Sequence, residues 1–146
     1  MNVLVDTNIL VRLSQAGHPH QADCKSALTR LLQRRDQGVL CTQAAIEFWS
    51  VATRPQTANG LGLDPSQAEA SLRDFETLLV WLPEPPDIGA RWRAIVNRYS
   101  IRGRQAHDAR LVAFMQATGL TDLLTLNAAD FTRYDAITCV RPADVR

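Results

Sequence analysis

Four acidic residues stand where an apolar run ends or where a helical pattern begins. Asp6 follows "NVLV", Glu47 lies in the helical pattern after "VLCT", Asp108 opens the pattern "HDARLVAFMQATG", and Asp130 lies in the turn after "DLLTL". Carboxylates that converge repel one another unless a divalent cation neutralises them, and oxygen ligands suit Mg²⁺ or Mn²⁺ better than zinc. Such a cation polarises a phosphoryl oxygen and lowers the pKa of a bound water. The four acids therefore predict metal-dependent phosphoryl chemistry.

Each acid also has a purely structural interpretation, because an aspartate near the start of a helix is a common cap and complements the helix dipole. Glu47 fits that interpretation least well. It lies in "QAAIEFWSVA", whose other residues are mostly apolar, and an ionised carboxylate there is costly unless it is paired or bound to a metal. Taken together, the four acids favour a site.

Other chemistries have weaker support in the sequence. Gly60 and Gly62 form a G-x-G, but no preceding strand and no third glycine make it a dinucleotide fingerprint. His18 and His20 flank a proline, His107 is remote from them, and no cysteine pair supports a zinc site. The chain has no G-x-S-x-G and no P-loop.

Short apolar runs alternate with helical patterns along the chain. Strands are predicted at 2–5, 39–42, 122–126 and 136–140, with a further short one in "LLVWLPEPP". Helices are predicted in a long pattern that Gly38 ends, and at about 43–53, 65–77, 87–99 and 104–118, the last closed by Gly119. The residues after the first strand read as a polar turn, and "RPQTANGLGLDP" reads as a loop.

This alternation predicts the α/β class, as a three-layer α/β/α sandwich whose central sheet has about five mostly parallel strands. A length of 146 residues fits one domain, taken as residues 1–146. In such sheets ligands bind outside the carboxyl ends of the strands, and that is where the acids stand.

Composition and charge set the broad class. Hydrophobic residues make up 46% and charged residues 21% of the chain, and neither a signal peptide nor a transmembrane helix is expected. The three cysteines are odd in number and widely spaced, so a disulfide framework is not expected and a reducing cytoplasm fits best. A net charge of +1 provides no global basic field, so any nucleic-acid binding must be local.

Four segments in order resemble the PIN domain family, and specifically its VapC-like ribonuclease toxins. They are "VLVDTNIL" at the start, "EFWSVATRP" from Glu47, "HDARLVA" from His107 and "LLTLNAADF" ending at Phe131. The resemblance covers essentially the whole chain. It implies endonucleolytic cleavage of RNA by metal-activated water, a cognate antitoxin as partner, and a homodimer.

The resemblance also implies roles for individual residues. By it, Asp6, Glu47 and Asp108 hold the Mg²⁺ or Mn²⁺ and orient water, and Asn8 supports the first acid. A further acid is common four residues before the phenylalanine of the last segment, where this chain has Asn127. Either Asn127 ligates the metal through its carbonyl or Asp130 supplies the charge, and Thr125 positions that ligand.

Two other functions compete with the nuclease. A phosphohydrolase of the haloacid dehalogenase type also has an aspartate after its first strand, but it needs a second acid where Asn8 stands and a later lysine, for which Lys25 is badly placed. A catalytically weak module that binds RNA or protein is the other alternative, supported by Asn127 in place of an acid. It would use an arginine-rich segment that contains Arg91, Arg93, Arg98, Arg102, Arg104 and Arg110, although a solvated helix face also explains these residues.

Overall fold

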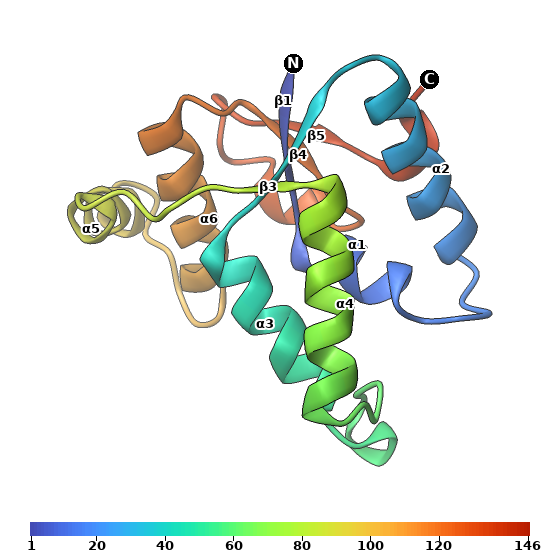
Figure 1. Cartoon of the computed structure of the whole chain (residues 1–146). Coiled ribbons are helices and arrows are strands. Elements are labelled where there is room, and N and C mark those ends of the chain that lie inside the picture. The colour runs from blue at the N-terminus through green and yellow to red at the C-terminus, as the bar shows by residue number, and fades with distance from the viewer.

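Five parallel strands form the central sheet of the protein, whose computed structural model describes residues 1–146 (Figure 1). The strands are β1 (Asn2–Val5), β2 (Gln37–Leu40), β3 (Val80–Trp81), β4 (Asp122–Leu124) and β5 (Thr138–Val140). Their order in the sheet is β3-β2-β1-β4-β5, and every neighbouring pair is parallel. In the central register Leu4 of β1 lies between Val39 of β2 and Leu123 of β4.

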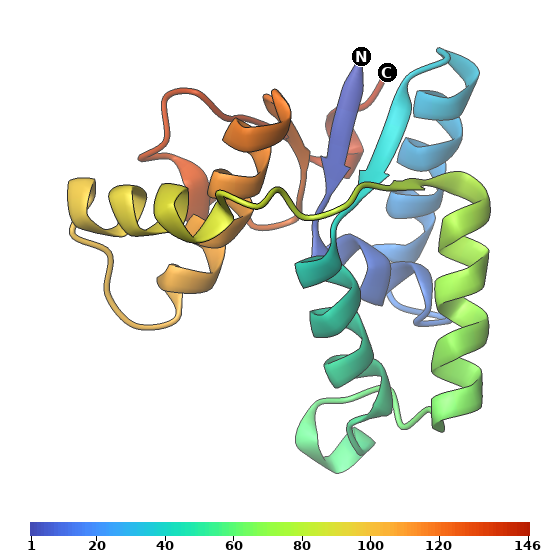
Figure 2. The ribbon, with the colours of Figure 1, turned by 60° about the vertical axis from the view of Figure 1, so that its left-hand side comes forward.

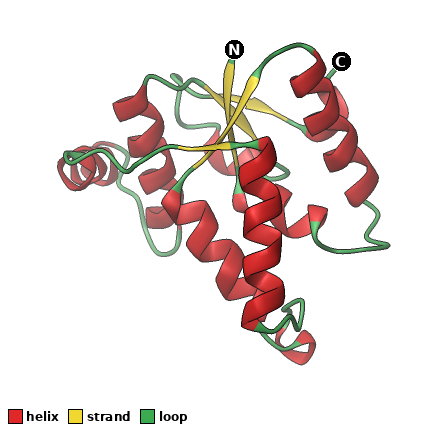
Figure 3. Cartoon of the chain, viewed as in Figure 1, coloured by secondary structure: helices red, strands yellow, loops and turns green.

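Six α-helices and two short 3₁₀ turns connect the strands, and a third 3₁₀ turn follows β5 (Figure 3). The helices are α1 (Thr7–Leu13), α2 (Gln21–Gln33), α3 (Thr42–Thr53), α4 (Pro65–Leu78), α5 (Ile88–Arg98) and α6 (Gln105–Thr118). The 3₁₀ turns are η1 (Gln56–Ala58), η2 (Ala128–Phe131) and η3 (Pro142–Asp144). Helices α5 and α6 lie on one side of the sheet, and α2 and α4 lie on the other (Figure 2). The predicted α/β fold with a parallel sheet of five strands is therefore confirmed.

No helix of the protein combines the length and the apolar character that crossing a membrane requires.

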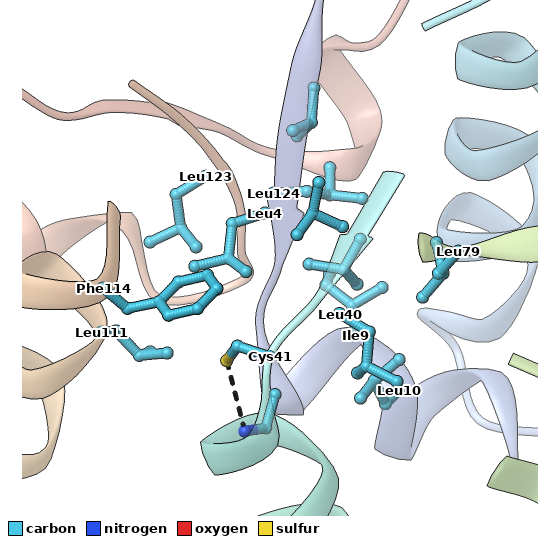
Figure 4. Packing of buried hydrophobic residues seen from close by; sticks show 14 of the residues in the cluster. Leu4, Ile9, Leu10, Leu40, Cys41, Leu79, Leu111, Phe114, Leu123 and Leu124 are labelled. Atoms are coloured by element: carbon cyan, nitrogen blue, oxygen red, sulfur yellow. Dashed lines mark hydrogen bonds between the residues drawn. The ribbon is translucent and has the colours of Figure 1, made fainter. Parts of the chain in front are cut away.

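The sheet is buried on both faces, which explains why its strands are continuous apolar runs instead of alternating ones. In the close view, Leu4 and Leu123 point toward Leu111 and Phe114 of α6, while Leu79 and the side chains of α1 lie on the opposite side (Figure 4). This double cover makes β1 the centre of the molecule and gives the first residue after it a rigid support.

Two predictions near β2 are wrong: the strand predicted at 39–42 is Gln37–Leu40, and the helix before it ends earlier than predicted. Gly38 does not end the preceding helix, because α2 stops at Gln33 and Arg35 makes the turn with a φ of 60°. Gly38 lies inside β2, where a Cβ would approach Leu79 Cδ2 to 2.5 Å, so a larger residue would force the Leu79 side chain to move. The strand ends at Leu40 because the next residue caps α3.

The start of α3 and the start of α1 follow the same rule: the residue after a strand is the helix cap. The Cys41 Sγ accepts a hydrogen bond from the Ala44 amide at 3.5 Å (Figure 4), and the Asp6 carboxylate accepts one from the Thr7 amide at 2.8 Å. The predicted polar turn at residues 6–8 is therefore wrong, since helix α1 begins at Thr7.

Residues 54–63 fold back against the end of α3. The Leu61 amide donates to the Val51 carbonyl at 3.1 Å, and this hydrogen bond ties the loop to the last turns of α3. A Cβ on Gly60 would lie 2.0 Å from the Arg54 carbonyl oxygen, so only glycine fits at this position. The loop packs at the end of α3 that is remote from the sheet (Figure 1).

Candidate active site

A cleft of about 1030 Å³ opens at the carboxyl edge of the sheet. Asp6 from the end of β1, Glu47 from α3, Asp108 from the first turn of α6 and Asp130 from η2 all line it. Their elements are far apart in sequence, and the parallel sheet and its helices bring them to one place. Asn8 and Asn127 also line the cleft, whereas Thr125 is fully buried behind it.

Asp6 is held in place by three donors, none of them charged. Its Oδ1 accepts from the Thr7 amide at 2.8 Å, and its Oδ2 accepts from the Thr125 hydroxyl at 2.7 Å and from the Asn8 amide group at 3.2 Å. The residue is 7% exposed. Burial raises the pKa of Asp6 above its ordinary value, and the hydrogen bonds from Thr125 and Thr7 offset only part of that rise.

Asn8 and Thr125 join α1 to the segment after β4. The Asn8 amide group donates to Thr125 Oγ1 at 3.2 Å, and Asn8 Oδ1 accepts from the Leu126 amide at 3.1 Å. Thr125 Oγ1 also accepts from the Asn127 amide at 3.0 Å. Both residues thus bond to Asp6 and to the segment that carries Asn127.

Glu47 is also held by neutral side chains. Its Oε2 accepts from the Thr7 hydroxyl at 2.8 Å, and its Oε1 accepts from the Gln43 amide group at 3.0 Å. The same Gln43 nitrogen donates to the His107 carbonyl at 2.8 Å, and Gln43 Oε1 accepts from Arg110 at 3.3 Å. Gln43 therefore joins α3 to the start of α6, next to Asp108.

Sequence reasoning did not identify Gln43. The available signal was its position four residues before Glu47, which places both side chains on one face of α3. A second signal was a glutamine among apolar neighbours, since Gln43 is only 7% exposed and a buried amide needs partners.

Asp108 and Asp130 make no side-chain hydrogen bonds, unlike the other two acids. Burial and then the charges of Asp6, Asp130 and Glu47 raise the pKa of Asp108 to about 6. No arginine, lysine or histidine forms an ion pair with any of the four acids. The cleft therefore gathers four carboxylates that no ion pair neutralises.

The two candidates for the fourth acidic position both lie at the cleft. Asn127 and Asp130 are exposed there, and the side chain of Asn127 forms no hydrogen bond. Since the charge of Asp130 contributes to the raised pKa of Asp108, its carboxylate adds to the field of the cluster in a way that the neutral amide cannot.

The donor set fits a hard divalent cation that keeps part of its water. The facing atoms are carboxylate and amide oxygens, which Mg²⁺ and Mn²⁺ prefer. No three His, Cys, Asp or Glu side chains lie close enough together to hold one ion by themselves. Because Mg²⁺ is usually bound through one or two carboxylates and several waters, such an open arrangement suits a hydrated ion.

Comparisons with known proteins show which family this chain matches. The sequence pattern of the PIN domain matches residues 3–137. A similar protein is the ribonuclease VapC41 of Mycobacterium tuberculosis, 29% identical over 143 residues, which cover 92% of this chain and 94% of that protein.

Two solved structures share the fold. One is VapBC2 from Rickettsia felis bound to a DNA fragment from its promoter, with a TM-score of 0.72 and 16% identity over 97% of this chain and 98% of the other. The second is a toxin–antitoxin complex from Klebsiella pneumoniae, with a TM-score of 0.64 and 23% identity over 96% of this chain and 97% of the other.

Proposed function

Because this chain belongs to the PIN domain family, we propose that it is a metal-dependent endoribonuclease that hydrolyses RNA phosphodiester bonds, and that it is the toxin of a toxin–antitoxin pair. The observation that carries the proposal is the cleft with four carboxylates and no paired cation. The similarity to the ribonuclease VapC41 and to a toxin–antitoxin complex supports the substrate class and the partner.

The carboxylates of Asp6, Glu47 and Asp108, with Asn127, would hold Mg²⁺ or Mn²⁺, some of them through water that stays on the ion. When bound, the ion supplies charge stabilisation at the phosphate and a water of lowered pKa. Asp6 and Glu47 are locked by neutral donors, so their oxygens keep a fixed position without losing negative charge. This preorganisation is the contribution of the chain to catalysis.

Asp130 has a different role in this proposal. Its carboxylate is exposed at the cleft and has no hydrogen-bond partner, so an Asp130 oxygen is free to accept the proton that the attacking water loses. The alternative role, as the fourth metal ligand in place of Asn127, predicts a different phenotype. Asp130→Asn then weakens Mn²⁺ binding in calorimetry, whereas a proton acceptor leaves that affinity unchanged.

The partners follow from the same proposal. We expect a small antitoxin that covers the acidic cleft, and a homodimer, because Ile46, Val80 and Trp81 expose 61%, 43% and 38% of their surface around the edge strand β3. The cytoplasm is the proposed compartment, in keeping with the RNA substrate and with three free cysteines.

The test is cleavage of total RNA by protein purified away from any antitoxin. We expect Mg²⁺ or Mn²⁺ to support cleavage, a chelator to stop it, and sequencing of the new 5′ ends to identify the site. A protein that binds RNA but cuts nothing in either metal would instead be the binding module. A phosphoryl adduct on Asp6 would point to the phosphohydrolase.

A further inference from the structure

The cleft extends well past the acids along helix α1. Asn8, Val11 and Arg12 line it from one face of the helix, and Gln15 lines it just after the helix ends. Arg12 stands one turn beyond Asn8, about 6 Å along the helix axis. The cleft therefore has a basic group close to, but displaced from, the carboxylates.

Arg12 lines the cleft without any carboxylate partner, and one of its donors is buried and unpaired. The arginines that form ion pairs are Arg34, Arg73, Arg91, Arg110 and Arg141. Arg12 is partly buried, its Nη1 donates to Gln15 Oε1 at 2.9 Å, and its Nε is buried without any hydrogen-bond partner. An unpaired buried donor is unfavourable, and a bound ligand is one way in which proteins satisfy it.

The free part of Arg12 has the shape of an anion site. Gln15 occupies Nη1, so Nε–H and Nη2 have no partner, and these two groups form one edge of the planar guanidinium. Because Nε is covered by neighbouring atoms, a ligand reaches the whole edge only when the side chain turns toward the cleft. Such an edge matches two oxygens of one phosphate. A phosphate beside a metal-dependent cleavage site is the group that an RNA strand would bring there.

We propose that Arg12 binds a backbone phosphate of the RNA strand next to the one that is cleaved, so that the substrate runs along the face of α1 that lines the cleft. This inference rests on the proposed ribonuclease function. It adds the path of the RNA strand along α1 and a residue that binds its backbone. Two other occupants are outcomes of the test: the acid cluster itself, with Arg12 as a distant counter-charge, and an acidic side chain of a protein partner.

The experiment measures RNA affinity in an Asp108→Asn background, in which the RNA survives. The probe is a fluorescent mixed-sequence RNA dodecamer, titrated in Mg²⁺ at several KCl concentrations. The variants are Arg12→Gln, Arg12→Lys and, as the matched control for charge, Arg73→Gln, which lies on α4 far from the cleft lining.

We expect Arg12→Gln to weaken binding about tenfold and to reduce the slope of log affinity against log salt by about 0.7. Arg12→Lys keeps the positive charge but loses the two-donor edge of the guanidinium. It should therefore keep the salt dependence of the parent and weaken RNA binding about threefold. Arg73→Gln should match the parent. If Arg12→Gln does not fold, the Arg12→Lys result decides alone, and parental affinity in that variant overturns the proposal.

Three results would overturn the assignment of Arg12. One is equal RNA affinity of Arg12→Gln and Arg73→Gln. The second is a changed Mn²⁺ affinity of Arg12→Gln in calorimetry, which identifies a counter-charge. The third is loss of antitoxin binding with RNA affinity intact. Failure of the proposed function looks different, because the unmutated protein then neither binds nor cleaves RNA.

Discussion

Asp6 and Asp36 are both shielded carboxylates, but they stand at opposite ends of the sheet and have opposite surroundings. The Asp36 side chain is 9% exposed, and its oxygens lie 3.1 Å from the amino group of Met1 and 3.1 Å from Arg34 Nε. Asp6 receives hydrogen bonds only from Thr7, Asn8 and Thr125, all of them neutral. The carboxylate at one end of the sheet has cationic partners within the chain, and the carboxylate at the other end has none.

The difference separates a structural carboxylate from a functional one. Cations beside Asp36 stabilise the folded chain at that edge, although exposed partners limit the gain. Neutral donors in the cleft fix the acids and leave their charge available, so repulsion among them is relieved only by a cation from outside. Carboxyl groups that converge in a cleft, have raised pKa values and form no ion pair are typical of functional sites.

The largest expected effect concerns activity. Asp6→Asn should reduce metal-dependent RNA cleavage by on the order of a hundredfold to a thousandfold, because it removes charge where the cleft needs it. Asp36→Asn is the matched control and should cleave at the parental rate, since Asp36 lies away from the cleft. Equal losses in both variants, measured as initial rates on one RNA, would show that the cleft carries no special role.

The next effect tests the neutral donors. Gln43→Met keeps the volume of the side chain but removes the amide that holds Glu47 and the His107 carbonyl, and we expect cleavage to fall about tenfold. Gln33→Met, at an exposed position of α2, is the control. A parental rate for Gln43→Met would mean that Glu47 needs no positioning.

Stability should change in opposite directions at the two ends of the sheet. In metal-free protein at pH 7, Asp108→Asn should raise the free energy of unfolding by about 1 kcal/mol, a figure reduced for the partial exposure of the group. Asp36→Asn should lower it by about 1 kcal/mol through loss of its cationic partners. Urea unfolding measures both, and a destabilised Asp108→Asn contradicts the picture of unrelieved repulsion.

The smallest expected effect is a pH dependence. The pKa of Asp108 is raised from 3.8 to about 6 on folding, so the folded state binds more protons than the unfolded state between those values. Stability of the metal-free protein should therefore fall by about 1 kcal/mol or less as pH rises from 4 to 7. Asp108→Asn should flatten the curve, and Mn²⁺ should raise the melting temperature at pH 7. An unchanged slope in the variant would assign the dependence to other groups.

Much of the fold was predictable because local patterns agree with the tertiary arrangement. The strand at residues 2–5 and the helices from 43, 65, 87 and 104 were predicted to within one or two residues, and Gly119 ends α6 with a φ of 73° as expected. The errors at Gly38 and at residues 6–8 have one cause. Glycine and polar residues signal a break in regular structure, but contact with Leu79 and the capping of α1 are set by segments elsewhere in the chain.

The sequence by itself determined the parallel sheet and the positions of the acids at its carboxyl edge, because apolar runs and the residues that end them are local properties. Only the tertiary structure decided which neutral groups hold those acids. Thr7 reaches Glu47, Thr125 reaches Asp6, and Gln43 reaches the start of α6, and each contact joins segments distant in sequence. The same applies to Arg12, whose free edge follows from the absence of any acid beside it after folding.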